Sequence, residues 1–199
     1  SGPKDTNPIY SPDGKTIAFI RPDENEIRQI WVISTMGGEA QRLSSFSHGV
    51  QEMIWSPDGT QVAVVSDVPQ EKSNGQESIT DDSKVRVVEN IKYREDGLGW
   101  RGTLYRQIFV LEVSSAEVNQ VTFAKGDHRS PAWSPDGARI AFVSDMENDR
   151  DIEDGNAVYV ISSSGDEPEN WSHGLITVER PVWSPDGDKI AVFGSQDPK

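Results

Sequence analysis

Charged residues that stand beside aromatic ones, in the stretch from Tyr93 to Arg101, are the first candidates for chemistry in this sequence. Arg94, Asp96 and Arg101 share that stretch with Tyr93 and Trp100. A guanidinium group can bind a carboxylate through two parallel hydrogen bonds, and a neighbouring ring offers apolar contact. We therefore expect these three charged residues to contact a ligand or a neighbouring domain. The alternative is a structural loop in which the Asp and Arg side chains pair with one another.

Three histidines occupy similar places in the sequence. His48 and His173 both stand in Ser-His-Gly, and His128 lies in a corresponding link. Histidine is the commonest metal ligand. However, a repeated chain explains the similar placement without chemistry, and links of separate repeats lie far apart unless they face a common axis. We expect no metal site at these histidines.

The segment 145–154 is dense in carboxylates. Ca²⁺ takes oxygen ligands from such side chains. The spacing departs from that of an EF-hand, because the glycine falls at the wrong position. A solvated loop between two strands is the expected structure, and calcium binding by this loop stays an open alternative.

The sequence contains none of the usual machinery for nucleophilic hydrolysis. No Gly-x-Ser-x-Gly sequence occurs and cysteine is absent, so we expect no catalytic residue, no thiolate metal site and no cofactor in this chain. Trp55, Trp133 and Trp183 recur at equivalent positions and could stack on a carbohydrate. Core packing between repeats is the better interpretation, because an aromatic residue at a repeated position buries a large apolar area.

These candidates are positioned by a segment that the chain repeats four times. An aromatic residue followed by Ser-Pro-Asp-Gly begins at Tyr10, Trp55, Trp133 and Trp183. Proline presets φ in such a turn, aspartate can hydrogen-bond the nearby backbone, and glycine takes positive φ. Each turn therefore predicts a β-hairpin. An apolar run follows each turn, which predicts a second strand that is covered on both faces, with Ala18, Ala63, Ala141 and Ala191 in one narrow column.

The spacing of the repeats predicts an all-β fold, a β-propeller. Four short strands in about 45 residues are typical of one propeller blade. A single domain over 1–199 then holds about 3.5 four-stranded blades. We place blade one at 9–44, blade two at 50–122 with an insert at 67–106, blade three at 131–172 and a half blade at 181–193. Within the insert, Val85 to Val88 is predicted to form a further strand.

The net charge and the distribution of apolar residues limit the classes of partner that we expect. The 199 residues carry a formal net charge of −14, so neither nucleic acid nor an anionic membrane surface is an expected partner. No apolar run approaches the roughly 20 residues that span a bilayer. A cytoplasmic location is the default expectation, and an export signal removed before residue 1 is the alternative.

The four hairpins resemble the repeats shared by TolB-type propellers and by the N-terminal propeller of the prolyl oligopeptidase family of serine peptidases. The stretch from Lys92 to Trp100 is similar to the Tyr-Arg-x-Asp-Gly-x-Gly-aromatic insert of the acylaminoacyl-peptidase-like branch. A strand of the Leu-Tyr-x-x-Ile-Phe-Val kind follows it there and here, at Leu104 to Val110. The resemblance covers essentially all of Ile9 to Phe193.

The resemblance implies a non-catalytic propeller that gates and positions peptide substrates for a C-terminal α/β-hydrolase domain of the same polypeptide. It implies that Arg94, Asp96 and Arg101 contact peptide or that domain. The alternative is a TolB-like propeller that serves as a protein-binding platform without enzymatic activity. Because the chain stops at Lys199 in mid-repeat, we expect it to belong to a longer polypeptide. The alternative is self-association, in which two chains complete one propeller ring.

Overall fold

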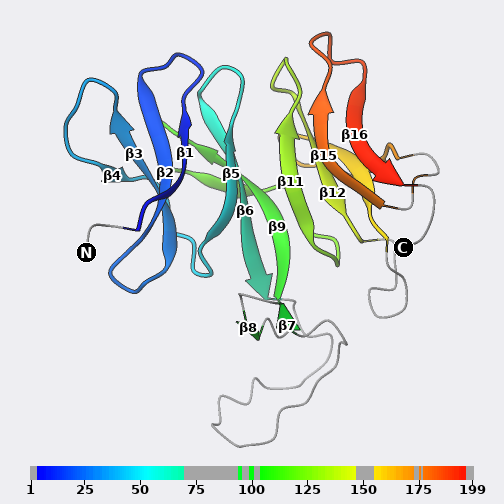
Figure 1. Cartoon of the computed structure of the whole chain (residues 1–199), viewed down its shortest axis with the longest axis horizontal. Coiled ribbons are helices and arrows are strands. Elements are labelled where there is room, and N and C mark those ends of the chain that lie inside the picture. The colour runs from blue at the N-terminus through cyan, green and yellow to red at the C-terminus, as the bar shows by residue number, and fades with distance from the viewer. Residues whose placement is uncertain are drawn as a thin grey trace, which may run out of the picture.

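The computed structural model consists of antiparallel sheets that follow one another along the chain (Figure 1). It describes residues 4–69, 94–95, 99–100, 104–146, 155–172, 175 and 177–195, with the backbone alone for 94–95 and 99–100. Every regular element within these residues is a strand. The described part of the chain therefore contains no helix that could cross a lipid bilayer.

Two four-stranded sheets form the N-terminal part. The strands of the first lie in the order β1 (Thr6–Tyr10), β2 (Thr16–Pro22), β3 (Arg28–Ser34) and β4 (Gln41–Arg42). The strands of the second lie in the order β5 (Val50–Trp55), β6 (Gln61–Pro69), β9 (Leu104–Glu112) and β10 (Val118–Gln120). Each sheet is thus an antiparallel meander, as the repeated hairpin predicts.

The C-terminal part holds a third four-stranded sheet and a two-stranded one. The third has the order β11 (His128–Trp133), β12 (Arg139–Ser144), β13 (Ala157–Ser162) and β14 (Glu169–Asn170), and the fourth pairs β15 (Thr177–Trp183) with β16 (Ile190–Ser195). The short strands β7 (Arg94–Glu95) and β8 (Gly99–Trp100) pair separately. In Figure 1 the four sheets stand side by side in chain order, with their Ser-Pro-Asp-Gly turns at the upper edge.

The Ser-Pro-Asp-Gly turn is closed by its own serine and aspartate. In the third sheet the Ser134 hydroxyl donates to Asp136 Oδ1 at 2.5 Å and accepts the Arg139 N–H at 2.9 Å. The Gly137 N–H donates to the Ser134 carbonyl at 2.9 Å, and Gly137 has φ 71°. The Ser134 hydroxyl and then the Ala138 N–H lower the pKa of the Asp136 carboxyl. Because the equivalent serine–aspartate bond recurs in all four turns, each hairpin is specified locally.

Successive turns also stack on one another. A Cβ added to Gly59 would lie 3.2 Å from Cδ of Pro12, and one added to Gly187 would lie 3.6 Å from Cδ of Pro135. Each turn glycine therefore packs against the proline of the preceding turn. A Cβ added to Gly14, the equivalent glycine of the first turn, would have no such neighbouring atom within 4 Å.

The apolar runs after the turns form the core, as predicted for three of the four. Strands β2, β6 and β12 are buried over most of their length, and Ala18, Ala63 and Ala141 are all at most 1% exposed. The expectation fails for β16, where Ala191 is exposed and Phe193 is 73% exposed. The reason is that no described segment covers that face of the fourth sheet.

The fourth strands are shorter than the sequence predicts, because a hydroxyl replaces a backbone group in the ladder. In the first sheet the Ser44 hydroxyl accepts the Ile30 N–H at 2.8 Å. In the second the Thr122 hydroxyl accepts the Ile108 N–H at 2.8 Å. Backbone pairing therefore ends before Ser44 and Thr122, and the chain turns away toward the next sheet.

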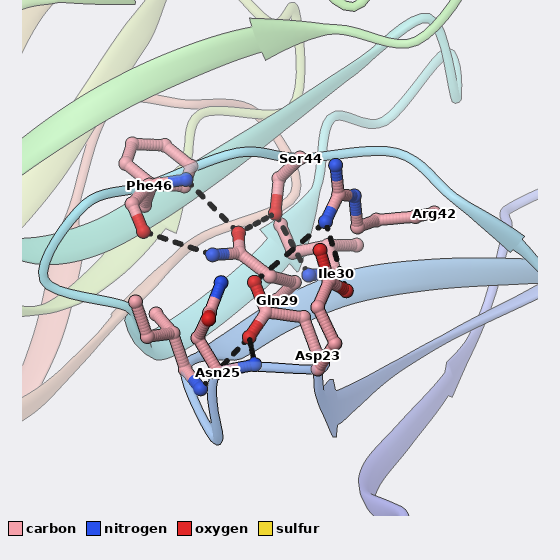
Figure 2. Close-up of polar contacts among 9 residues, drawn as sticks. Asp23, Asn25, Gln29, Ile30, Arg42, Ser44 and Phe46 are labelled. Carbon is pink, nitrogen blue, oxygen red and sulfur yellow. Dashed lines mark hydrogen bonds and ion pairs between the residues drawn. The ribbon is translucent and has the colours of Figure 1, made fainter.

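In the first sheet, the side chain of Gln29 holds the chain at Ser44 and Phe46, where it leaves the sheet after β4 (Figure 2). Its side chain is buried, donates to the Phe46 carbonyl at 2.8 Å, and accepts both the Phe46 N–H at 2.9 Å and the Ser44 hydroxyl at 2.8 Å. Gln107 in the second sheet donates to the Ala124 carbonyl at 3.0 Å in a similar way. A single amide side chain thereby holds the link between two sheets.

The insert of the second sheet starts later and ends earlier than 67–106. Strands β6 and β9 stay paired as far as Pro69 and Leu104, with Asp67 opposite Arg106. The strand predicted at Val85 to Val88 lies outside the described residues.

Candidate functional site

The sequence-predicted ligand contacts fall at the insert. Arg94 lies in β7, and its side chain is outside the described residues, as are Asp96 and Arg101 altogether. In Figure 1, β7 and β8 lie below β6 and β9, at the edge opposite the Ser-Pro-Asp-Gly turns. A contact of these residues with a ligand therefore remains a prediction.

Of the three histidines, His128 is held by structural bonds. It is fully buried, its Nδ1 lies 2.8 Å from the Ser144 hydroxyl, and its Nε2 lies 3.3 Å from the Ala124 carbonyl. His48 is exposed in a turn, and His173 lies outside the described residues. Within the described ranges, no group of three or more His, Cys, Asp or Glu side chains is arranged to hold a metal ion.

Most of the acidic segment 145–154 also lies outside the described residues. Its first member, Asp145, is buried and accepts the Asp127 N–H at 2.8 Å through Oδ1. Asp127 in turn accepts the Arg106 N–H at 2.9 Å. These two carboxylates thus bind backbone groups where the second and third sheets meet.

The repeated tryptophans pack between sheets, which confirms the core interpretation. Trp55, Trp133 and Trp183 are each at most 9% exposed. Each indole Nε1 donates to a carbonyl on the first strand of the preceding sheet, at 3.4 Å to Ile9, 3.2 Å to Ile54 and 2.9 Å to Ala132. We call this set of bonds the tryptophan ladder. It fixes the spacing of the four first strands, β1, β5, β11 and β15.

A second repeated feature of the first strands is a bulge three residues before the aromatic residue. The residues three positions before the aromatic residue are Asn7, Glu52, Ser130 and Arg180. The register shifts at Asn7, Ser130 and Arg180, whereas in the second sheet it shifts one residue earlier, between Val50 and Glu52, and Glu52 itself pairs with Val65. Three of them, Asn7, Ser130 and Arg180, have φ between 52° and 53°, and a proline follows each. Positive φ in non-glycine residues is uncommon and is often retained at functional sites.

Glu52 connects the second first strand, β5, to the bulge of the third, β11. Its Oε2 accepts the Ser130 N–H at 3.0 Å, so the carboxyl of one first strand satisfies a backbone donor of the next. Burial raises the pKa of the Glu52 carboxyl, and the Ser130 N–H, Arg106 and Arg129 oppose that rise. Burial of a carboxyl that faces the bulge of a neighbouring strand is the kind of perturbation that marks candidate binding sites.

Glu52 and the bulge residues Ser130 and Arg180 line a pocket of about 550 Å³ between the first strands. Glu52, Ser130 and Arg180 supply its polar groups, whereas Pro131 and Pro181 contribute to its apolar wall. Ligand sites in proteins commonly combine a mostly apolar wall with a few polar groups that fix orientation. The pocket can therefore hold a small ligand that carries charged groups.

Comparison with known proteins gives the relationship at the level of fold and sequence. No family model matches the chain. The chain is 35% identical over 160 residues to the uncharacterised peptidase YuxL of Bacillus subtilis, covering 79% of this chain and 24% of that protein. Its structure is similar to Pyrococcus horikoshii acylaminoacyl peptidase, with TM-score 0.71, 20% identity, and coverage of 98% of this chain and 29% of that one. The fold is a β-propeller.

The propeller assignment agrees with a further neighbour. TolB from Acinetobacter baumannii matches with TM-score 0.59 and 18% identity over 96% of this chain and 37% of that one. The predicted resemblance to TolB-type and acylaminoacyl-peptidase propellers is therefore confirmed. The chain spans about a quarter of the length of YuxL.

The polar pocket residues Glu52, Ser130 and Arg180 were missed by reasoning from sequence. A signal was present: the position three residues before the aromatic residue is polar in every repeat, and proline follows it in three of four. Proline favours sheet edges and bulges, because it cannot donate to a ladder. An aligned column of Asn, Glu, Ser and Arg beside that proline could have indicated a polar column on the first strands.

The raised pKa of Glu52 gives a pH prediction for the stability of the propeller. Between the ordinary pKa of glutamate, about 4.3, and its raised value, the folded state binds more protons than the unfolded state. The contribution of Glu52 to stability therefore falls as pH rises through this window. We expect the difference in melting temperature, Glu52→Gln minus the unsubstituted chain, to increase as pH rises from 4 through this window and then to stay constant, as measured by thermal unfolding.

The matched control for that experiment is Glu39→Gln, a substitution at an exposed glutamate. Its difference from the unsubstituted chain should not grow over the same pH range. A constant difference for Glu52→Gln from pH 4 to pH 8 would contradict the prediction.

Proposed function

We propose that this chain is the non-catalytic propeller portion of a serine peptidase of the prolyl oligopeptidase family, and that it gates and positions peptide substrates for a hydrolase domain outside this chain. The observation that carries the proposal is the similarity to YuxL, named a peptidase, over 160 residues. The similarity in fold to acylaminoacyl peptidase supports it. The absence of a Gly-x-Ser-x-Gly elbow from the sequence limits the role to binding and access.

The insert is the first proposed contact with peptide. Arg94, Asp96 and Arg101 offer both signs of charge for a peptide backbone terminus or side chain. β7 and β8 lie at one edge of the propeller, below the strands that carry them (Figure 1). In the intact polypeptide, Arg94→Ala with Arg101→Ala should lower kcat/KM for peptide hydrolysis about tenfold, the effect of losing about 1.4 kcal/mol of transition-state binding.

The control for the insert is Lys125→Ala, which removes an exposed positive charge from the link between the second and third sheets. It should leave kcat/KM unchanged. Unchanged kcat/KM in the Arg94 and Arg101 double variant would remove the insert from the substrate path. A polypeptide that hydrolyses no peptide at all would remove the peptidase proposal itself.

A second candidate function is favoured by the similarity to TolB. A TolB-like propeller would be a protein-binding platform with no enzyme attached. The mass of the natural polypeptide distinguishes the two candidates. A chain of roughly 600–700 residues leaves room for further blades and a hydrolase domain of ordinary size.

A further inference from the structure

Glu52 and Arg180, each three residues before a tryptophan, carry opposite charges and are incompletely paired among the described residues. Glu52 Oε2 accepts the Ser130 N–H at 3.0 Å, and Oε1 makes no hydrogen bond with any described residue. Arg180 is exposed and forms no ion pair within the described part of the chain. Both residues line the same pocket, Glu52 on β5 and Arg180 on β15. One side of the pocket thus presents a carboxylate and another a guanidinium.

A structural role accounts for only part of this arrangement. Glu52 ties β5 to β11 through Ser130, so its presence alone needs no ligand. Arg180 makes no comparable tie to any residue that the structure describes, although it has the same backbone geometry as Asn7 and Ser130. A guanidinium placed in a pocket and left without a carboxylate is a ready site for an anionic group.

The apolar part of the pocket lining favours an organic ligand over a simple ion. The pocket of about 550 Å³ is also lined by Ile54, Ala132 and Val182, all from the first strands. That volume falls within the range of about 300–1,000 Å³ that holds small organic ligands. The pocket thus offers a ligand a carboxylate, a guanidinium and an apolar wall, which suits a molecule that carries both charges and apolar groups.

We propose that this pocket binds a short zwitterionic peptide, with its α-amino group at Glu52, its α-carboxylate at Arg180 and its side chains against the apolar wall. The proposal rests on the proposed function for the choice of a peptide among zwitterionic ligands. It adds a binding site and the chemical class of its ligand. The bond from the Ser130 N–H holds the carboxylate of Glu52 in place before the ligand arrives.

Calorimetric titration of the intact polypeptide that carries this chain tests the proposal. The probe is the tripeptide Ala-Pro-Phe, compared with its N-acetylated form and its C-terminal amide. The polypeptide is first treated with phenylmethylsulfonyl fluoride, so that hydrolysis adds no heat. We expect acetylation and amidation each to weaken binding at least about tenfold, which corresponds to about 1.4 kcal/mol.

Substitutions assign each effect to its residue. Glu52→Gln should weaken binding of the free tripeptide and abolish the difference made by acetylation. Arg180→Ala should weaken binding of the free tripeptide and abolish the difference made by amidation. Arg180→Lys, which keeps the positive charge, should bind the free tripeptide more tightly than Arg180→Ala. Glu39→Gln and Lys125→Ala, both at exposed positions, should bind like the unsubstituted protein.

The outcomes separate this inference from the proposed function. Equal binding of all three peptides, or of the substituted and unsubstituted proteins, overturns the zwitterion site even when the polypeptide hydrolyses peptides. Charge-dependent binding by a polypeptide without hydrolytic activity upholds the site and refutes the peptidase. Absence of any measurable binding at millimolar tripeptide also overturns the site.

Discussion

Replacement of Trp133 by alanine should lower the free energy of unfolding by about 3–5 kcal/mol. The indole is buried in the cluster that joins the second and third sheets, and its Nε1 donates to the Ile54 carbonyl at 3.2 Å. Alanine would leave a cavity between the sheets and an unsatisfied carbonyl. Chemical denaturation followed by tryptophan fluorescence and circular dichroism measures the loss.

Tyr10 supplies the matched control for Trp133, because it occupies the same place in the first repeat. It is 64% exposed, since no described sheet precedes it. Tyr10→Ala should change the free energy of unfolding by no more than about 0.5 kcal/mol. Similar losses for Tyr10→Ala and Trp133→Ala would show that the ladder contributes little and that the aromatic residue acts only within its own hairpin.

Gln29→Leu should destabilise the propeller by at least about 3 kcal/mol, with each buried polar group left unsatisfied costing about 1–3 kcal/mol. The substitution removes the partners of the Phe46 N–H, the Phe46 carbonyl and the Ser44 hydroxyl (Figure 2). Leucine is of similar volume, so lost packing contributes little. Urea denaturation at neutral pH measures the effect.

The control for Gln29 is Gln61→Leu, which removes one partly exposed bond from Gln61 Nε2 to Glu112 at 3.2 Å. Exposed groups can turn to water, so this change should cost well under about 1 kcal/mol. A small effect at both positions would mean that water enters the link at Phe46 and replaces the glutamine.

The hairpins were predictable from sequence because their chemistry is local. Ser134, Asp136 and Gly137 close their turn through bonds that span five residues or fewer. Strand coverage was predictable wherever a neighbouring sheet follows. It failed at Ala191, because burial of that residue depends on a neighbour that the sequence pattern of one repeat does not contain.

The pocket was harder to foresee because it arises between repeats. Ser130 and Glu52 lie 78 residues apart in sequence, and their bond depends on a bulge that the hydrophobic pattern does not reveal. The end of each fourth strand was also missed, because the Ser44 hydroxyl takes the place of a backbone acceptor. Reading columns of aligned repeats, in addition to each repeat along its length, would have found both features.

The hydrogen bonds of the tryptophan ladder all run in one direction along the sequence, which affects how the chain can fold during its synthesis. In each bond the carbonyl acceptor belongs to the earlier repeat and the indole donor to the later one, as with Ile9 and Trp55. A ribosome therefore completes every acceptor before its donor emerges, and translation at about 5–20 residues per second leaves seconds between successive repeats. Each nascent hairpin meets a template already in place, so the array can grow vectorially from its N-terminus, one repeat at a time.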